Sequence, residues 1–360
     1  MEYLFEINDK EILSSDKIRE RINRQSTELT ATKCKIDNYA KQWEIIKKII
    51  HLHEYVYTSS YLRKNISQEV PISRSYFKMK EMILKYNLIE RDKKYKITCL
   101  AEAPGGFIQS FLSLRSVAEI HGITLISESS NIPYWHRSLF QKDKLKFHSG
   151  KDENGDLYSL GNVLSFISEL GQSSMDIVTG DGGFDYSNNY NDQEKDSLKL
   201  IYSEIFVAIN VQKKRGVFIC KIFDIFCEDT YQLLNILYMS YDAISIYKPC
   251  ISRFSNSEKY IVCQGFRGYN KEIVNEMIHH FDDNHLEYEI DSKFLNMIYR
   301  INEKYVLSQV DQINRGIDLI RENRFTKQPT KLQIETAIEW CRKYNIKINT
   351  ECIYLNRTIA

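Results

Sequence analysis

The sequence predicts an α/β fold: a buried, mostly parallel sheet of seven strands with helices on both faces, flanked by helical extensions at both ends. Three observations lead to this prediction. Short β-rich runs alternate with helix-length segments from about residue 95 to about residue 266. The runs are almost continuously apolar, as strands are when helices cover both faces of a parallel sheet. The segments on either side carry helical periodicity instead.

Seven β-rich runs define the predicted sheet. They cover residues 95–101, 122–127, 144–149, 175–180, 216–223, 243–248 and 259–266. The intervening stretches 193–212 and 229–240 are amphipathic and long enough to form helices. The loop between the last two runs contains no helix-length segment, so we expect these two strands to pair antiparallel.

Residues 1–70 are polar with helical periodicity and are predicted to form a helical N-terminal extension. An amphipathic stripe recurs every three to four residues and comprises Trp43, Ile46, Ile49, Ile50 and His53. Pro71 interrupts this pattern, and Ser73 is a candidate N-cap for a helix that starts at Arg74.

The strand pattern stops after Gly268. We therefore expect a central domain at residues 71–268 and a helical C-terminal extension at residues 269–360. The last helix of that extension is expected to open at Pro329-Thr330.

The composition excludes several classes of protein. With 43% hydrophobic and 27% charged residues, this chain of 360 residues can bury a large core and is not disordered. Its 14 glycines and 5 prolines exclude collagen-like and Pro-rich proteins. The 49 basic and 48 acidic residues give a net charge of +1. That balance argues against attachment to nucleic acid or membrane by bulk charge alone, but it leaves room for a local basic groove.

The sequence favours a soluble, intracellular protein without membrane attachment. Its start is acidic and lacks the apolar run of a signal peptide. No apolar stretch reaches the roughly 18 residues of a membrane span. The eight cysteines are then expected to be reduced, and a structural zinc site would need distant pairing because no Cys-x-x-Cys pair occurs. The abundance of Tyr, Ile, Lys and Asn is typical of an AT-rich genome, such as that of a large DNA virus or a protist. Nucleus and cytoplasm both remain open, and a viral protein would act in the virion or the host cytoplasm.

The first motif that carries chemistry follows the first predicted strand. It consists of Ala101, Glu102, Ala103, Pro104, Gly105, Gly106 and Phe107. Paired glycines at a strand-to-helix turn allow a ligand to approach the backbone closely. An ordinary tight turn is the alternative. The third glycine of a dinucleotide fingerprint and the Gly-Lys-Ser/Thr of a P-loop are both missing.

The second motif, residues 179–185, follows the fourth predicted strand and contains Asp181. The carboxyl ends of parallel strands meet at one edge of a sheet, so Asp181 is expected to lie beside the first motif, where such folds bind ligands. A turn in which Asp181 bonds its own backbone is the alternative.

Two more charged side chains mark the same edge. Lys221 ends an apolar strand, and burial would lower its pKa and make it a usable base, although a satisfied ion pair is equally consistent with the pattern. Glu258 opens the last strand, a position at which most glutamates are simply solvated.

Together and in this order, the motifs resemble the FtsJ-type (RrmJ-like) ribose 2′-O-methyltransferases, and most closely their mRNA cap 2′-O-methyltransferase branch. The segment 101–107 resembles the family's S-adenosylmethionine loop, and 179–185 the motif with its catalytic Asp. Residues 220–226 resemble the strand with the catalytic Lys, and 252–266 the segment with the catalytic Glu. The helix at 73–79 resembles the one that carries an earlier catalytic Lys, here Lys78. The resemblance covers about residues 70 to 268 and implies a Rossmann-like methyltransferase sheet.

The resemblance implies a catalytic tetrad of Lys78, Asp181, Lys221 and Glu258. A ribose 2′-hydroxyl is a very weak acid, so methyl transfer needs a base or a field that favours deprotonation. Lys221 is the natural base if burial and the charge of Lys78 shift it toward its neutral form. The carboxylates oppose that shift and are expected to orient the lysines. In-line positioning supplies most of the remaining catalysis, and no metal is required.

The resemblance also implies S-adenosyl-L-methionine as cofactor. Its methionine end is expected to lie against Glu102, Ala103, Pro104, Gly105, Gly106 and Phe107, and its methyl group near Asp181. Asp156, in a segment similar to the family's Gly-Asp-Ile motif, is a candidate partner of the adenine. Glu128 follows the second strand, where many methyltransferases bind the ribose.

RNA is the implied substrate, with the first transcribed nucleotide of capped mRNA as the most specific expectation. Arg74 and Lys80 flank Lys78 and are candidate contacts to the RNA backbone, and Asn256 and Ser257 are candidate contacts to the target ribose. The extensions match no motif and are candidate surfaces for other capping or transcription proteins. Methylation of ribosomal or transfer RNA is one alternative. A catalytically silent RNA-binding or assembly subunit that retains the fold is another.

The near-neutral total charge hides a segregation along the chain. Residues 1–100 carry about +6, residues 101–200 about −6, residues 201–300 about −2 and residues 301–360 about +3. An acidic middle suits a cofactor with a positive sulfonium, and basic flanks suit RNA phosphates. We therefore expect RNA to lie along the N-terminal helices and Lys78.

Overall fold

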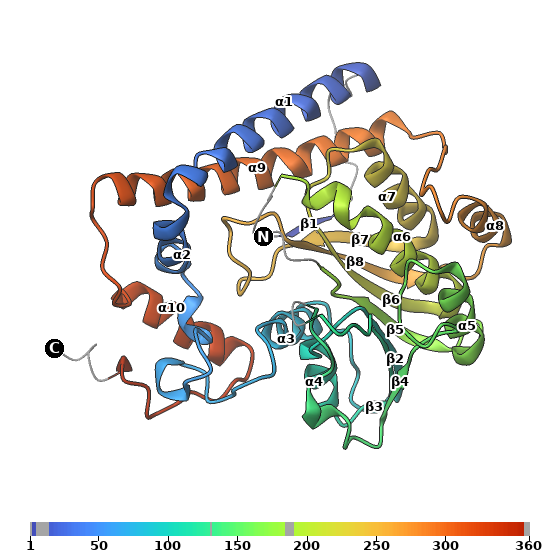
Figure 1. Cartoon of the computed structure of the whole chain (residues 1–360), viewed down its shortest axis with the longest axis horizontal. Coiled ribbons are helices and arrows are strands. Elements are labelled where there is room, and N and C mark those ends of the chain that lie inside the picture. Colours follow the sequence, from blue (N-terminus) through green and yellow to red (C-terminus); the bar gives the residue numbers. More distant parts are fainter. Residues whose placement is uncertain (1, 5–13, 130–131, 184–190, 356–360) are drawn as a thin grey trace.

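The protein is described by a computed structural model that covers residues 2–4, 14–129, 132–183 and 191–355 (Figure 1). The strands are β1 (Glu2–Leu4), β2 (Tyr95–Leu100), β3 (Val117–Ile123), β4 (Leu145–His148), β5 (Met175–Gly180), β6 (Gln212–Ile222), β7 (Tyr241–Tyr247) and β8 (Lys259–Phe266). The α-helices are α1 (Ser15–Cys34), α2 (Ala40–Ile49), α3 (Ser75–Lys85), α4 (Gly106–Leu112), α5 (Leu160–Leu170), α6 (Gln193–Val211), α7 (Glu228–Ser240), α8 (Lys271–His279), α9 (Ser292–Arg321) and α10 (Lys331–Lys343). Short 3₁₀ helices span Asp37–Tyr39, Glu54–Val56, Leu62–Lys64 and Arg137–Leu139.

The strands form one mixed sheet in the order β1-β7-β8-β6-β5-β2-β3-β4. β6, β5, β2, β3 and β4 are mutually parallel, whereas β8 runs antiparallel to both β6 and β7. All seven predicted strands are present, and the antiparallel pairing of the last two is confirmed.

Two details of the sheet differ from the prediction. Residues 2–4, expected to be helical, form an eighth strand that pairs antiparallel with β7. The second strand covers 117–123 rather than 122–127, because Ile120 to Ile123 pair with β4 while Leu125 and Ile126 lie exposed beyond the sheet. An apolar run of six residues does not distinguish a strand from the apolar loop that follows it.

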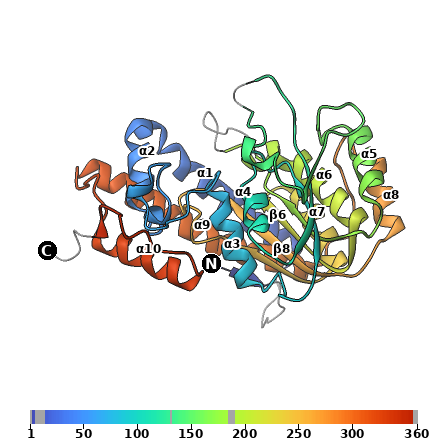
Figure 2. The same cartoon turned by 90° about the horizontal axis from the view of Figure 1, so that it is seen from below.

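Helices cover both faces of the sheet, as predicted. Buried side chains of α3 and α4 pack on one face, against Ile97, Ile177 and Ile219. Buried side chains of α5, α6 and α7 pack on the other, against neighbours in the same strands such as Val178 and Phe218. The alternation of adjacent residues between the two clusters reflects the two-residue period of a strand. Figure 2, seen from below, brings α3 and α4 toward the viewer.

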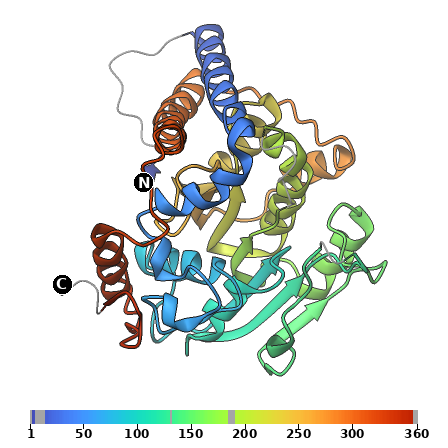
Figure 3. The ribbon, with the colours of Figure 1, turned by 60° about the vertical axis from the view of Figure 1, so that its left-hand side comes forward.

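The two extensions pack on each other and on the sheet domain. α1 lies alongside α9 in two views (Figures 1 and 3), and buried residues of both helices belong to the core on the α6 face. α10 opens at Thr330, as predicted, with a capping box formed with Gln333. The Gln333 side-chain amide donates to the carbonyls of Lys48, Ile49 and His51 at 2.9–3.2 Å, so α10 caps the end of α2. No helix among the described residues is long and apolar enough to cross a membrane.

The start of α3 differs by one residue from the prediction. α3 begins at Ser75, and Ser73 does not cap it. The Ser73 hydroxyl lies 2.7 Å from the Ser75 hydroxyl instead, and both hydroxyls face Gly106. The Ser73 hydroxyl is therefore packed against the glycine loop and does not cap the helix.

Candidate active site

The register of the sheet brings the predicted motifs together at its carboxyl edge. Leu100 of β2 lies opposite Gly180 of β5, and Gly180 lies opposite Cys220 of β6. The next residues, Ala101, Asp181 and Lys221, therefore stand side by side. On the far side of β6, Lys221 pairs with Tyr260 of β8.

The four tetrad residues share the face of the sheet that α3 covers. Asp181 lies four residues beyond Ile177 and Lys221 two residues beyond Ile219, both buried against that face, and Glu258 lies two residues before Tyr260, which is buried there as well. α3 presents Lys78 to this row: its Nζ lies 2.6 Å from Glu258 Oε1 and 3.5 Å from the Tyr260 hydroxyl.

Tyr260 connects the two lysine–carboxylate pairs. Its hydroxyl donates to Asp181 Oδ1 at 2.7 Å. Lys221 Nζ donates to the Asp181 backbone carbonyl at 2.8 Å and lies 3.4 Å from Asp181 Oδ1. The four tetrad side chains are only 11–16% exposed. The structure thus brings all four together where access to solvent is restricted.

The charges around the tetrad favour the ionised forms of Lys221 and Glu258. Burial opposes the charge of Glu258, but Lys78 and Lys221 outweigh it and lower the pKa of that carboxyl to about 2. Burial would likewise lower the pKa of Lys221, yet Asp181, Glu258 and Glu204 outweigh burial and raise it above its ordinary value. The protein's own charges therefore do not meet the condition for a neutral Lys221, because its nearest carboxylates hold the proton on the amine.

Sequence reasoning missed three polar groups that support the tetrad. Tyr260 lies two residues beyond Glu258 in a strand, so the period of two could have identified it. Ser252 donates to Glu258 Oε1 at 2.6 Å from the preceding loop, where no pattern marks it. Glu204, in α6, lies behind the row and accepts from the Cys220 thiol at 3.1 Å.

Glu204 is a buried carboxyl with an unusual charge state. Burial raises its pKa to about 8, against the opposing effects of the Cys220 thiol and the charge of Lys221. A Cβ on Gly180 or on Gly182 would lie within 2.5 Å of a Glu204 or Leu200 side-chain atom. Because Gly180 and Gly182 have no side chain, the Glu204 side chain can pack beneath Asp181.

The glycine loop between β2 and α4 is held by its own backbone and by its neighbours. Gly105 has φ of +109°, and a Cβ there would also lie 2.4 Å from Leu139. A Cβ on Gly106 would lie 2.1–2.2 Å from the hydroxyls of Ser75 and Ser73. Phe107 is fully buried and packs against the Tyr260 ring at 5.8 Å. Ala103 and Pro104 are joined by a cis peptide bond.

Glu102 points into the protein rather than toward a ligand. It is 3% exposed, accepts from the Thr179 hydroxyl, and its pKa is raised well above the ordinary value by burial. Its Oε2 has no hydrogen-bond partner among the described residues. Glu102 thus links β2 to β5 beneath the loop.

The loops after β3 and β4 complete this edge of the sheet. Ile126 N–H donates to the Asn154 carbonyl at 2.7 Å, so the two loops run together. Gly155 has φ of +66°, and a Cβ there would lie 1.9 Å from the Thr124 carbonyl oxygen. Asp156 accepts the Tyr158 N–H at 2.8 Å, and Glu128 is exposed. Glu128, Asp156 and Asp181 therefore follow β3, β4 and β5, whose carboxyl ends lie at the same edge of the sheet.

Of the candidate RNA contacts on α3, neither side chain reaches the tetrad. Arg74 donates to Glu54 Oε2 at 3.3 Å and to the carbonyls of Tyr57 and Ile251. Lys80 lies about 200° around the helix from Lys78 and sits over the Tyr76 ring at 5.4 Å. Burial lowers the pKa of Lys80.

The two candidates in the β7–β8 loop differ in exposure. Asn256 is exposed, and its side chain and carbonyl accept from Lys248 Nζ at 2.8 and 2.7 Å. Ser257 is 1% exposed and donates to Asp224 at 2.8 Å. Asn256 can meet a ligand directly, whereas Ser257 can act only by holding the loop.

Two expectations have limits set by the described residues. Phe184 and Asp185 of the second motif lie outside them. Within the described part of the chain, no three His, Cys, Asp or Glu side chains are placed to hold a metal ion, and all eight cysteines are free thiols.

Comparisons with known proteins identify the family. A family model for FtsJ-like methyltransferases matches residues 71–266. The cap-specific mRNA (nucleoside-2′-O-)-methyltransferase of Autographa californica nuclear polyhedrosis virus is 27% identical over 241 residues, covering 65% of this chain and 84% of that protein. The corresponding enzyme 1A of Caenorhabditis briggsae is 37% identical over 201 residues, covering 53% and 22%.

A further relative is also matched over only part of its length. The cap-specific mRNA (nucleoside-2′-O-)-methyltransferase 1 of Leishmania braziliensis is 28% identical over 189 residues, and the match spans 51% of this chain and 47% of that one. The chain thus matches about half of that relative's length. A Plasmodium falciparum crystal structure assigned to a ribosomal RNA methyltransferase aligns at a TM-score of 0.39 and 21% identity, over 54% of this chain and 98% of that one. Since the family model covers more than half of the residues, including all four of the tetrad, the chain belongs to the FtsJ-like methyltransferase family.

Proposed function

We propose that the protein is an S-adenosylmethionine-dependent RNA ribose 2′-O-methyltransferase that acts on the first transcribed nucleotide of capped mRNA. The observation that carries this proposal is the pairing of Lys78 with Glu258 and of Lys221 with Asp181 at one sheet edge, beside the 101–107 loop. The names of the relatives from Autographa californica nuclear polyhedrosis virus, Caenorhabditis briggsae and Leishmania braziliensis support capped mRNA as the substrate.

In this proposal the tetrad handles the proton of the ribose 2′-hydroxyl. Lys221 is the base and takes that proton when its amine is neutral. Its raised pKa means that a further positive charge must approach before the neutral form is favoured. Lys78, fixed by Glu258, is already among the charges around Lys221, so the further charge would have to come from the bound cofactor. Asp181, oriented by Tyr260, keeps Lys221 Nζ in place to take the proton from the 2′-hydroxyl.

The chain's residues fit S-adenosylmethionine at this edge. When bound, it supplies a methyl group on a positively charged sulfonium. The exposed side chains Leu125, Ile126 and Tyr158 offer apolar surface for the adenine, next to the carboxylate of Asp156. Glu128 is exposed and can meet the ribose hydroxyls. The cofactor would then lie in the acidic segment 101–200, and RNA would lie on the basic segments 1–100 and 301–360.

The test is methyl transfer from labelled S-adenosylmethionine to a capped RNA and to the same RNA without a cap. We expect transfer to the capped RNA, located by mass spectrometry on the 2′-oxygen of the first nucleotide. Lys221→Ala should lower the rate by about 10²- to 10⁴-fold. Lys213→Ala, at the other end of the same strand, is the matched control and should keep full activity. Undiminished transfer by Lys221→Ala would overturn the mechanism.

Two alternatives give different outcomes in the same assay. A ribosomal or transfer RNA methyltransferase would prefer structured RNA without a cap. A silent RNA-binding or assembly subunit would transfer no methyl group, and calorimetry would detect no binding of S-adenosylmethionine. The complete tetrad argues against the silent subunit, because nothing in RNA binding alone requires four buried ionic groups.

A further inference from the structure

A carboxylate on the other face of the sheet holds the two residues that flank Glu258 in the chain. Asp224, two residues beyond the end of β6, accepts from the Ser257 hydroxyl at 2.8 Å. Lys259 Nζ lies 3.6 Å from Asp224 Oδ1 and donates to the Ser257 carbonyl at 2.9 Å. Lys259 lies two residues before Ile261, which is buried on the α6 face. The neighbours of Glu258 therefore point away from the tetrad, while Glu258 points toward it.

This network is buried and includes a lysine of the N-terminal extension. Its members Asp224, Ser257, Lys259 and Lys33 of α1 are all more than nine-tenths buried. Lys33 Nζ lies 2.8 Å from Asp224 Oδ2. Burial opposes the charge of Asp224, but Lys33 and Lys259 outweigh it and keep the pKa of that carboxyl below its ordinary value. Asp224 is therefore ionised at neutral pH and holds its partners as a charged group.

Helix α9 holds both chain segments that the network joins. Gln309 donates to the Ser257 hydroxyl and to the Ser255 carbonyl, each at 3.3 Å. Asn302, about two turns earlier in the same helix, donates to the Ile225 carbonyl, next to Asp224. The C-terminal extension thus fixes the segment after β6 and the segment before β8 at once.

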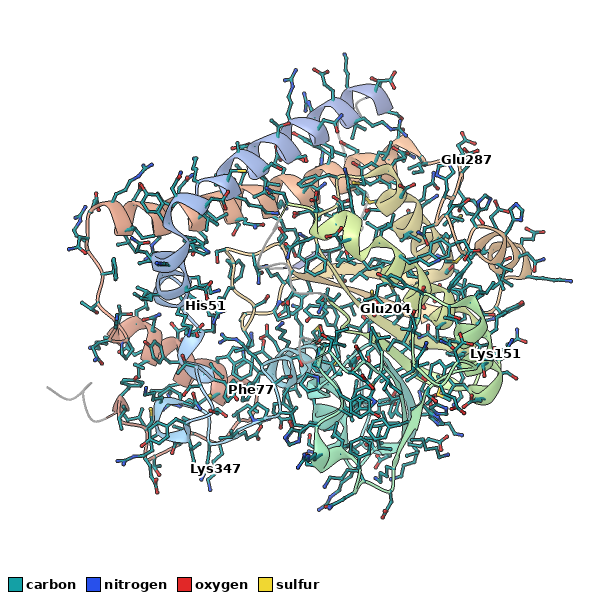
Figure 4. The ribbon with its side chains drawn as sticks, viewed as in Figure 1. His51, Phe77, Lys151, Glu204, Glu287 and Lys347 are labelled. Atoms are coloured by element: carbon teal, nitrogen blue, oxygen red, sulfur yellow. The ribbon has the colours of Figure 1, made fainter. Side chains whose placement is uncertain are left out.

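Helix α6 supports the segment after β6 from the other side. Glu194, in its first turn, accepts from the backbone N–H groups of Phe226 and Cys227 at 2.7 and 2.8 Å. Glu204, labelled on the same helix in Figure 4, accepts from the Cys220 thiol. The stretch of chain between residues 220 and 227, which carries Lys221 and Asp224, is therefore anchored at both ends.

We infer that Asp224 is a positioning residue of the active site. It holds both chain neighbours of Glu258, so it fixes the direction from which the Glu258 carboxylate meets Lys78. It also lies three residues after Lys221, so one carboxylate sets the spacing between the proposed base and Glu258. This inference rests on the proposed function, since it assigns a task to a neighbour of the proposed tetrad. It gives α1 and α9 a part in catalysis in addition to their part in the core.

The first experiment compares Asp224→Asn with Asp176→Asn in the full chain. Asparagine keeps the size of the side chain but loses the charge that holds Lys259, so kcat should fall about 10- to 100-fold. The KM values for capped RNA and for S-adenosylmethionine should change less than about twofold. Asp176 pairs with Lys213 at 3.0 Å at the other edge of the sheet, and its variant should keep kcat within about twofold. Equal kcat for the two variants, or a raised KM with unchanged kcat, would overturn the inference.

A double variant separates positioning from stability. Asp224→Asn leaves Lys33 in a buried position without the carboxylate of Asp224, which destabilises the fold. Adding Lys33→Met removes that buried charge. The double variant should therefore recover part of the lost unfolding temperature, while kcat stays at the level of Asp224→Asn. Recovery of kcat together with the unfolding temperature would show that Asp224 acts through stability alone, against the inference.

Hydrogen exchange tests the positioning without any methyl transfer. In the protein without cofactor or RNA, mass spectrometry should detect amide exchange in residues 255–261 that is about tenfold faster in Asp224→Asn than in the unaltered chain. Asp176→Asn should leave exchange in this segment unchanged, and equal exchange in the two variants would contradict the inference. If the unaltered chain methylated no capped RNA but this difference in exchange was present, the proposed function would fail while Asp224 would still hold Glu258. The two proposals therefore fail separately.

Discussion

At the residue scale, the site follows from the two-residue period of the strands. Asp181, Lys221 and Glu258 could be predicted because each follows or opens an apolar strand at the same edge. The raised pKa of Lys221 could not, because Glu204 contributes to it from α6. The orientation of the Asp181 carboxylate depends on Tyr260, whose hydroxyl donates to Asp181 Oδ1 at 2.7 Å.

Tyr260→Phe should lower kcat about tenfold with little change in the affinity for S-adenosylmethionine. The ring stays packed on Phe107, but Asp181 loses the donor that fixes its orientation, and positioning of the reacting groups suffers. Steady-state kinetics and calorimetry measure the two quantities. Tyr202→Phe removes a buried hydroxyl that donates to the Met277 carbonyl, far from the site. It should cost about 1 kcal/mol of stability and leave kcat unchanged. Equal kcat for both variants would refute a positioning role for Tyr260.

Glu204→Gln should flatten the dependence of stability on pH. Between the ordinary pKa of 4.5 and about 8, the folded chain holds a proton on Glu204 that the unfolded chain has lost. Stability therefore falls as pH rises through this window, by about 1.4 kcal/mol per pH unit from this group. Glutamine keeps the shape of the protonated acid and cannot ionise. Urea unfolding at about pH 5.5 and about pH 7.5 should show the variant gaining relative to the original chain. Parallel curves, like those expected for the exposed control Glu289→Gln, would contradict this.

At the element scale, strands and long helices could be predicted, and their ends could not. The apolar runs identified seven strands because burial on both faces imposes apolar residues throughout. β1 was missed because three residues on an edge carry no pattern, and β3 was displaced because the exposed Leu125 and Ile126 resemble a strand. The start of α3 was misplaced because Ser73 and Ser75 pack against Gly106, which lies 33 and 31 residues further along the chain.

Gly106→Ala should separate α3 from the glycine loop. The new Cβ would lie 2.1–2.2 Å from the hydroxyls of Ser75 and Ser73 and 2.9 Å from the Tyr76 backbone nitrogen, and backbone does not give way cheaply. We expect a loss of about 1–3 kcal/mol of stability. Because Lys78 is carried by the same helix, kcat should fall as well. Chemical unfolding and kinetics test this.

Gly161→Ala is the control for that substitution. It lies in the first turn of α5, where the nearest atoms to a new Cβ are 3.6 Å away. The added methyl should stabilise the chain by up to about 1 kcal/mol and leave kcat unchanged. If Gly106→Ala behaved like this control, the close contact between α3 and the loop would not matter for the site.

At the scale of the whole molecule, buried carboxylates join the extensions to the catalytic segment. Glu54 of the N-terminal extension binds two arginines of the central segment. Glu81 of α3 accepts from the Trp340 indole of α10 at 2.9 Å. Asp224, after β6, pairs with Lys33 of α1 at 2.8 Å. None of these partners could be predicted, because each joins residues that are far apart in the sequence. We propose that residues 1–70 and 269–360 complete the core of 71–268 and are not separate domains.

A fragment of residues 71–268 should therefore fail to fold cooperatively. It lacks Ile18 and Ile22 of α1 and Leu295 and Ile298 of α9, all fully buried in the core on the α6 face, and it leaves Phe77 uncovered. Losing each such side chain costs about 2–5 kcal/mol, so the four together cost about 8–20 kcal/mol, as much as the 5–15 kcal/mol that stabilises an ordinary domain. Circular dichroism during heating measures the transition. The full chain with Trp340→Ala should keep a sharp transition at a lower temperature, because it loses only one side chain of this contact. A fragment that unfolds sharply near the full chain's temperature would show that residues 71–268 are an independent domain, and the extensions would then be attachments rather than part of the core.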